Sequence, residues 1–78
     1  MALFYLQVFD DIAARNEEPI EAASEVAAVE LAVRGARELA AQQVLAGRLN
    51  LSHRIEVADE TGDDLRTVYV RDAIRIVG

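Results

Sequence analysis

The longest periodic stretch of the chain, residues 24–46, has the pattern of an amphipathic helix. At about 100° per residue, its apolar side chains fall in one broad stripe and its charged side chains gather on the opposite side. The stripe consists of Val26, Val29, Ala32, Val33, Ala36, Leu39, Ala40 and Val44. The pattern therefore predicts one long helix that packs against a core along this stripe.

Both ends of this segment carry residues that favour a helix boundary. Ser24 is suited to cap the first turn, and Gly47 stands where a left-handed residue commonly closes a helix. Gly35 lies in the middle, where glycine costs about 1 kcal/mol relative to alanine. We therefore expect the backbone of a strand, or of a second subunit, to approach the helix closely at Gly35.

Three segments have the composition and alternation of β-strands. Residues 3–9 are apolar on both faces, which is typical of a central strand covered on both sides and is otherwise an aggregation hazard. Residues 53–58 alternate, with Ile55 and Val57 on one face. Residues 59–63 have an acidic start and Gly62 at the fourth position, as in a hairpin turn, and residues 64–70 form the returning strand.

The remaining segments are less regular. Residues 10–23 form an acidic loop in which Pro19 prevents a continuous strand ladder. The pattern leaves open a short edge strand over residues 20–22. It also leaves open whether the tail, residues 71–78, contains a helical turn or a strand.

These elements predict a single α+β domain over residues 1–78. In the order β-α-β-β, we expect a three-stranded, mainly antiparallel sheet with the helix on one face. Because antiparallel neighbours outnumber parallel ones, the first strand is expected beside the last. The residues expected to meet between sheet and helix are Phe4, Leu6, Val8, Ile55, Val57, Val68, Val70, Val29, Val33, Ala36, Leu39 and Ala40.

The composition indicates a folded, soluble protein. Hydrophobic residues make up 53% of the chain, yet no apolar run approaches the roughly 18 residues of a membrane span. The start lacks the features of a signal peptide and cysteine is absent, so we expect a cytoplasmic protein. Without cysteine, neither disulfides nor a Cys/His zinc site can support so small a core, which leaves oligomerisation as the expected support.

Four segments carry a resemblance to a known family: FYLQVFDD at 4–11, NEEPIEAASEVAA at 16–28, ARELAAQQVLAGR at 36–48 and RIEVADETGDDLRTVYVRDAI at 54–74. They are similar to segments of domain-of-unknown-function family 6894, a family of short uncharacterised proteobacterial proteins. The chain departs from the family pattern at Gln7, where histidine is frequent, at Asp11 and Pro19, where glycine is usual, and at Tyr69, where proline is common. The resemblance implies a small βαββ-type domain and no particular activity.

No residue pattern is typical of an enzyme. His53 is the only histidine, and Ser52 beside it would point to the opposite face of a strand, so we expect an exposed His53 that serves no nucleophile. The acidic hairpin lacks the residue order of an EF-hand, and the four glycines are too far apart for a phosphate-binding loop. We therefore expect no catalytic residue, no cofactor and no metal ion.

One face of the predicted sheet would remain open, because a single helix covers a single face. The apolar and aromatic residues on that face are Leu3, Tyr5, Phe9, Leu65 and Tyr69. Aromatic sheet faces also bind single-stranded RNA, but a net charge of −6 without lysine disfavours direct contact with nucleic acid. We therefore expect this face to mediate protein contacts, most simply in a twofold homodimer.

An alternative function follows from the acidic residues, which cluster in two predicted loops. They are Asp10, Asp11, Glu17, Glu18, Asp59, Glu60, Asp63 and Asp64. Carboxylates arranged in this way can present negative charge as nucleic-acid phosphates do. The alternative is an acidic inhibitor or antitoxin-like protein that binds the basic surface of a nucleic-acid-binding partner.

Overall fold

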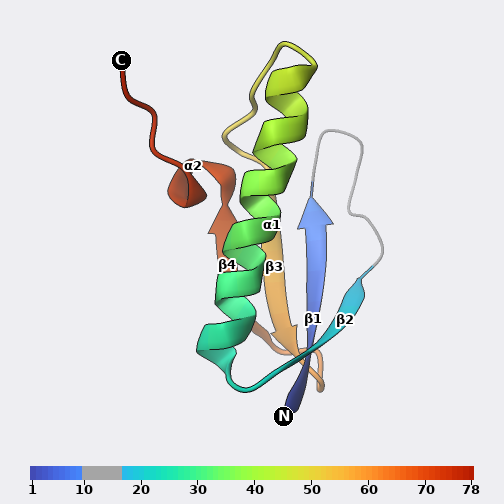
Figure 1. Ribbon diagram of the computed structural model, residues 1–78. Coiled ribbons are helices and arrows are strands. Elements are labelled where there is room, and N and C mark those ends of the chain that lie inside the picture. Colours follow the sequence, from blue (N-terminus) through green and yellow to red (C-terminus); the bar gives the residue numbers. More distant parts are fainter. Residues whose placement is uncertain (10–16) are drawn as a thin grey trace.

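The computed structural model describes residues 1–9 and 17–78, and it has two layers, an antiparallel sheet and one long helix (Figure 1). The strands are β1 (Ala2–Phe9), β2 (Glu18–Ala22), β3 (Arg54–Asp59) and β4 (Asp64–Tyr69); the helices are α1 (Glu25–Leu45) and the short α2 (Val70–Ala73). The sheet has four strands in the order β2-β1-β3-β4. The predicted α+β class, with one long helix against one face of an antiparallel sheet, is confirmed.

The edge strand that the sequence left open is present as β2. It begins at Glu18 and pairs with the first half of β1, so that Tyr5 lies opposite Pro19. Pro19 is compatible with this position because an edge strand needs inter-strand hydrogen bonds on only one side.

The expected position of β1 beside the last strand is wrong, because β1 lies between β2 and β3. The tight turn after Asp59 already places β4 beside β3. On β4, Arg66 and Thr67 are exposed, which suits the edge of a sheet, whereas Ile55 and Val57 of β3 are buried and suit its centre.

The two predicted ends of α1 are confirmed. The Ser24 side chain accepts a hydrogen bond from the backbone N–H of Ala27 at 3.2 Å. At the other end Gly47 has φ +93°, and the backbone N–H of Arg48 donates to the carbonyl of Gln43 at 3.1 Å. This second bond is the 6→1 contact of a Schellman motif, so it is the left-handed glycine that ends the helix.

The face that α1 turns to the sheet is confirmed in part: Ala32, Ala36 and Ala40 of the predicted stripe are buried, but the two ends of the stripe are not. Val26 and Val44, expected in the core, are 67% and 59% exposed. The buried positions recur every four residues and are all alanine: Ala28, Ala32, Ala36 and Ala40. Because alanine has only a methyl side chain, this row lets the helix backbone lie close to the sheet. Larger side chains such as Val33 and Leu39 flank the row and are partly buried.

The inner face of the sheet is largely as expected. The register places Val8 opposite Ile55, and Ile55 opposite Val68, so these side chains share the face under α1. The predicted core residues that are buried are Phe4, Ile55, Val57, Val68 and Val70. Leu6 and Val8 are partly buried and pack against this core.

The close approach expected at Gly35 exists, but its partner is a side chain and not a backbone. A Cβ atom built on Gly35 would lie 2.9 Å from Cδ1 of Ile55. The glycine therefore makes room for a buried isoleucine of β3, and in the described part of the chain this contact accounts for a residue that weakens the helix.

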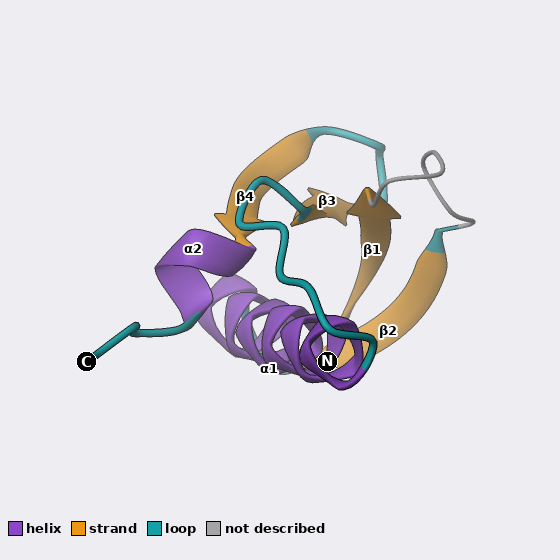
Figure 2. Cartoon of the chain, turned by 90° about the horizontal axis from the view of Figure 1, so that it is seen from above, coloured by secondary structure: helices purple, strands orange, loops and turns teal. Residues whose placement is uncertain are grey.

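The tail begins with a helical turn. In α2 the backbone N–H of Val70 donates to the carbonyl of His53 at 2.8 Å, and the Arg37 side chain donates to the carbonyl of Ala73 at 2.7 Å. Viewed from above, the sheet curves around α1, and α2 lies beside α1 on the β4 side (Figure 2). Residues 75–78 then lead away from the body of the domain (Figure 1).

Candidate interaction surfaces

The outer face of the sheet lies opposite α1, and none of the described elements covers it (Figures 1 and 2). All five residues expected there are half-buried within the single chain: Leu3, Tyr5, Phe9, Leu65 and Tyr69. Four of them belong to the outward set by strand alternation. Leu65 differs, because it packs against the core next to an irregularity in the β3–β4 register at Val57 and Ala58.

Arginine and aromatic side chains form a row across this outer face. Arg54 lies between Phe9 and Tyr69 in the strand register, and its guanidinium carbon stands 4.1 Å from the Phe9 ring centroid. Its Nε also lies 3.2 Å from a carboxylate oxygen of Glu56. Arg71 makes a similar contact, 4.4 Å above the Tyr69 ring. Both guanidinium groups therefore lie over aromatic rings at the distance of a cation–π interaction.

The acidic hairpin is organised by one of its own carboxylates. Oδ1 of Asp59 accepts hydrogen bonds from the backbone N–H groups of Thr61 and Asp63 and from the Thr61 hydroxyl, at 2.6 to 3.0 Å. These bonds, with the Thr61 hydroxyl contributing most, hold the pKa of Asp59 below its ordinary value of 3.8. Gly62 follows with φ +91°, as the turn prediction requires.

The acidic candidates that the structure describes lie on different elements. Glu60, Asp63 and Asp64 are exposed around the hairpin turn, which lies at the β3 end beside the start of β1. Glu17 and Glu18 are also exposed, but Glu18 belongs to the edge strand β2. Asp10 and Asp11 lie outside the described residues.

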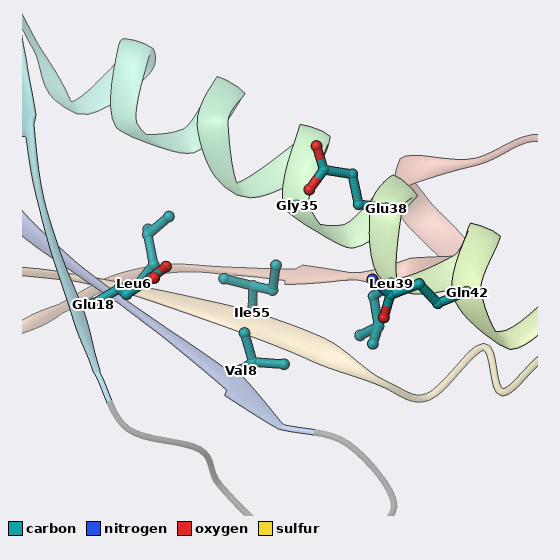
Figure 3. A pocket seen from close by; sticks show the side chains of 8 residues that line it. All are labelled: Leu6, Val8, Glu18, Gly35, Glu38, Leu39, Gln42 and Ile55. Carbon is teal, nitrogen blue, oxygen red and sulfur yellow. The ribbon is translucent and has the colours of Figure 1, made fainter.

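A groove between α1 and the inner face of the sheet was not anticipated. Its volume is about 360 Å³, and its apolar walls are formed by Leu6, Val8, Leu39 and Ile55, with Gly35 at the helix surface. Glu18 of β2 reaches toward it from one side, and Glu38 and Gln42 of α1 border it on the other (Figure 3). We call this site the α1–β1 groove. The sequence signal for it was Gly35, which marks the point of close approach.

The prediction of an exposed His53 is wrong, since this residue is only 5% exposed. It lies just before β3, where the loop after α1 folds back on the helix. Nδ1 of His53 is hydrogen-bonded to the side-chain nitrogen of Gln43, and the side-chain oxygen of Gln43 accepts the backbone N–H of Asn50 at 2.7 Å. Because an amide nitrogen is a donor, Nδ1 is the acceptor here. The histidine thus fastens the loop to α1.

Ser52, the other residue weighed for catalysis, donates its hydroxyl to Asn50 at 2.6 Å and is exposed. Within residues 1–9 and 17–78, no three side chains of the types His, Cys, Asp and Glu are close enough together to hold a metal ion. The described helices include none that is long and apolar enough to cross a membrane.

Comparison with known protein families matches residues 3–71 to a family described as "Domain of unknown function (DUF6894)". The match includes β1 from Leu3 onward, the other three strands and all of α1, as well as the outer face and the α1–β1 groove. Neither the curated proteins nor the solved structures contain a match.

Proposed function

Since this chain belongs to the DUF6894 family, whose function is unknown, its role must be argued from its surfaces, and we propose a non-enzymatic, homodimeric interaction module. The observation that supports this proposal is the outer face of the sheet. Its half-buried aromatic side chains have no described element above them, whereas α1 packs on the other face.

The chemistry of the outer face suits a protein contact. Tyrosine and arginine are enriched among the residues that dominate binding energy at interfaces. Here Arg54 and Arg71 already lie over the rings of Phe9 and Tyr69, which reduces the side-chain freedom that is lost when a partner binds. A twofold axis through this face would place the same row of residues on both sides of the contact.

Light scattering coupled to size exclusion tests the dimer. The expected mass is twice 8.6 kDa, and Tyr69→Glu should return it to that of one chain because a carboxylate would be buried without a partner. Ala41→Glu is the matched control, since it introduces the same charge at an exposed position of α1. The proposal would be overturned by a wild-type chain that elutes as a monomer at high concentration.

The hairpin favours a second candidate function, an acidic inhibitor of a basic, nucleic-acid-binding protein. Hydrogen bonds to Asp59 fix the turn, so Glu60, Asp63 and Asp64 are presented on a defined scaffold. Complementary charge of this kind accelerates association and makes it sensitive to salt.

This second function predicts a basic partner that leaves the immobilised chain when salt or excess duplex DNA is added. Replacing Glu60 with Gln and Asp63 and Asp64 with Asn should abolish capture, whereas Asp59 is kept because it organises the turn. Neutralising Glu21, Glu25 and Glu30, three exposed residues outside the hairpin, to Gln removes the same number of charges and provides the control for net charge. Retention of the same partners by the neutralised hairpin would exclude this function.

A further inference from the structure

We propose that the α1–β1 groove is the docking site for the segment Arg75–Val77 of a second copy of this chain. The inference rests on the proposed self-association and names a contact for it that is separate from the outer face. The groove and the outer face lie on opposite sides of the sheet, so each contact can be removed without touching the other.

The groove is complementary to an apolar segment that carries a positive charge. Its walls are aliphatic, with Leu6 and Val8 on the sheet side and Leu39 on the helix side. Two carboxylates, those of Glu18 and Glu38, stand at its borders (Figure 3). An occupant that buries aliphatic side chains and places a guanidinium between these carboxylates would satisfy both features.

The segment Arg75–Val77 has this chemistry. Ile76 and Val77 are 67% and 75% exposed, and Arg75 directly precedes them. The residue before this segment, Ile74, has an extended backbone and packs against the core, so the exposed part starts from a fixed point. Figure 1 shows the segment pointing away from its own domain.

The segment cannot fill the groove of its own chain. It leaves from α2, which is bonded to Arg37 on one flank of α1, whereas Gln42 at the groove is five residues further along and about 140° around the helix. Three extended residues span about 10 Å, and a helix with its side chains is about 10–12 Å across. The groove that Arg75–Val77 can reach is therefore that of another copy.

Disulfide trapping tests this contact directly, because the chain has no cysteine of its own. The single variants Val77→Cys and Gln42→Cys are mixed and oxidised mildly. We expect a covalent mixed dimer, since the first cysteine would enter the groove that the second borders. Ala41→Cys is the matched control: it is exposed, adjacent in sequence and turned about 100° away from the groove, and it should give at least tenfold less product.

Charge reversal provides a second test of the groove contact. Glu38→Arg in the Gln42→Cys chain should cut trapping severalfold, and adding Arg75→Glu to the Val77→Cys chain should restore it, because the two charges are then opposite again. A merely flexible tail would show neither effect. Trapping that is equal at positions 41 and 42, or insensitive to both reversals, overturns the inference.

The two proposals fail in distinguishable ways. If the wild-type chain has a dimeric mass but no trapping occurs at position 42, the groove contact is wrong and the outer-face dimer stands. If trapping occurs and survives Tyr69→Glu, the groove contact holds without the outer face. A monomeric mass together with absent trapping overturns both.

Discussion

Cδ1 of Ile55 occupies the space that a Cβ atom on Gly35 would need, at 2.9 Å from its ideal position. Gly35→Ala would gain about 1 kcal/mol of helix propensity but force a buried side chain to move. We expect these effects to cancel to within about 1 kcal/mol in wild type. In an Ile55→Val background, which lacks Cδ1, Gly35→Ala should be stabilising. A double-mutant cycle by urea denaturation measures the coupling, and additive effects would contradict the steric explanation.

The alanine row of α1 predicts a large difference between two identical substitutions. Ala36→Leu should destabilise the domain by about 1–3 kcal/mol or more, because the added atoms must fit between the helix and the sheet. Ala41→Leu, on the exposed side of the same helix, should stay within about 0.5 kcal/mol. Thermal unfolding followed by circular dichroism compares the two, and equal losses would contradict the position of the row.

Gln43 connects α1 to the loop that follows it through two hydrogen bonds, to His53 and to the backbone of Asn50. Gln43→Ala should therefore cost about 1–3 kcal/mol, at about 0.5–1.5 kcal/mol for each bond. The neighbouring Gln42→Ala should have little effect, because Gln42 is exposed. Urea denaturation gives both values. If the two variants are equally stable, the loop is not held by Gln43.

Asp59 predicts a specific dependence of stability on pH. Its folded-state pKa is lowered, so its contribution is present above the ordinary value of 3.8 and is lost as the pH falls through the folded pKa. Asp59→Asn should therefore lower the melting temperature at pH 7 more than at pH 2.5. Glu60→Gln should show no such difference, because the Glu60 side chain is exposed and the hydrogen bonds that fix the turn are made to Asp59. A penalty for Asp59→Asn that is equal at both pH values would contradict this role.

The elements that the sequence predicted well are those marked by local chemistry. Ser24 caps α1 with its side chain, Gly47 and Gly62 adopt the left-handed backbone that their turns require, and all three occupy the expected positions. The inner residues of the strands, such as Ile55 and Val68, were also recognisable because alternation fixes their face.

The features that were missed depend on contacts between distant segments. Val26 is exposed although it is as hydrophobic as Val29. The side of α1 that contacts the sheet is made of alanine, so the polarity of the side chains does not show the exact rotation of the helix about its axis. His53 is buried by Gln43, ten residues earlier, and no local pattern signals that pairing. The groove between α1 and β1 is bordered by Glu18 of β2, so it depends on β2 lying beside β1, and that strand order was not predicted.

The strand order also determines how the chain must fold. The hairpins β1–β2 and β3–β4 and the helix α1 join residues that are near one another in the sequence, whereas β1 and β3 pair residues 45 to 55 positions apart. Closing that long loop costs chain entropy before any of the central ladder is gained. The folding rate should therefore be limited by the pairing of β1 with β3, since α1 lies within the loop that this pairing closes. The β1–β3 ladder at the centre of the sheet would then be the last part of the molecule to form.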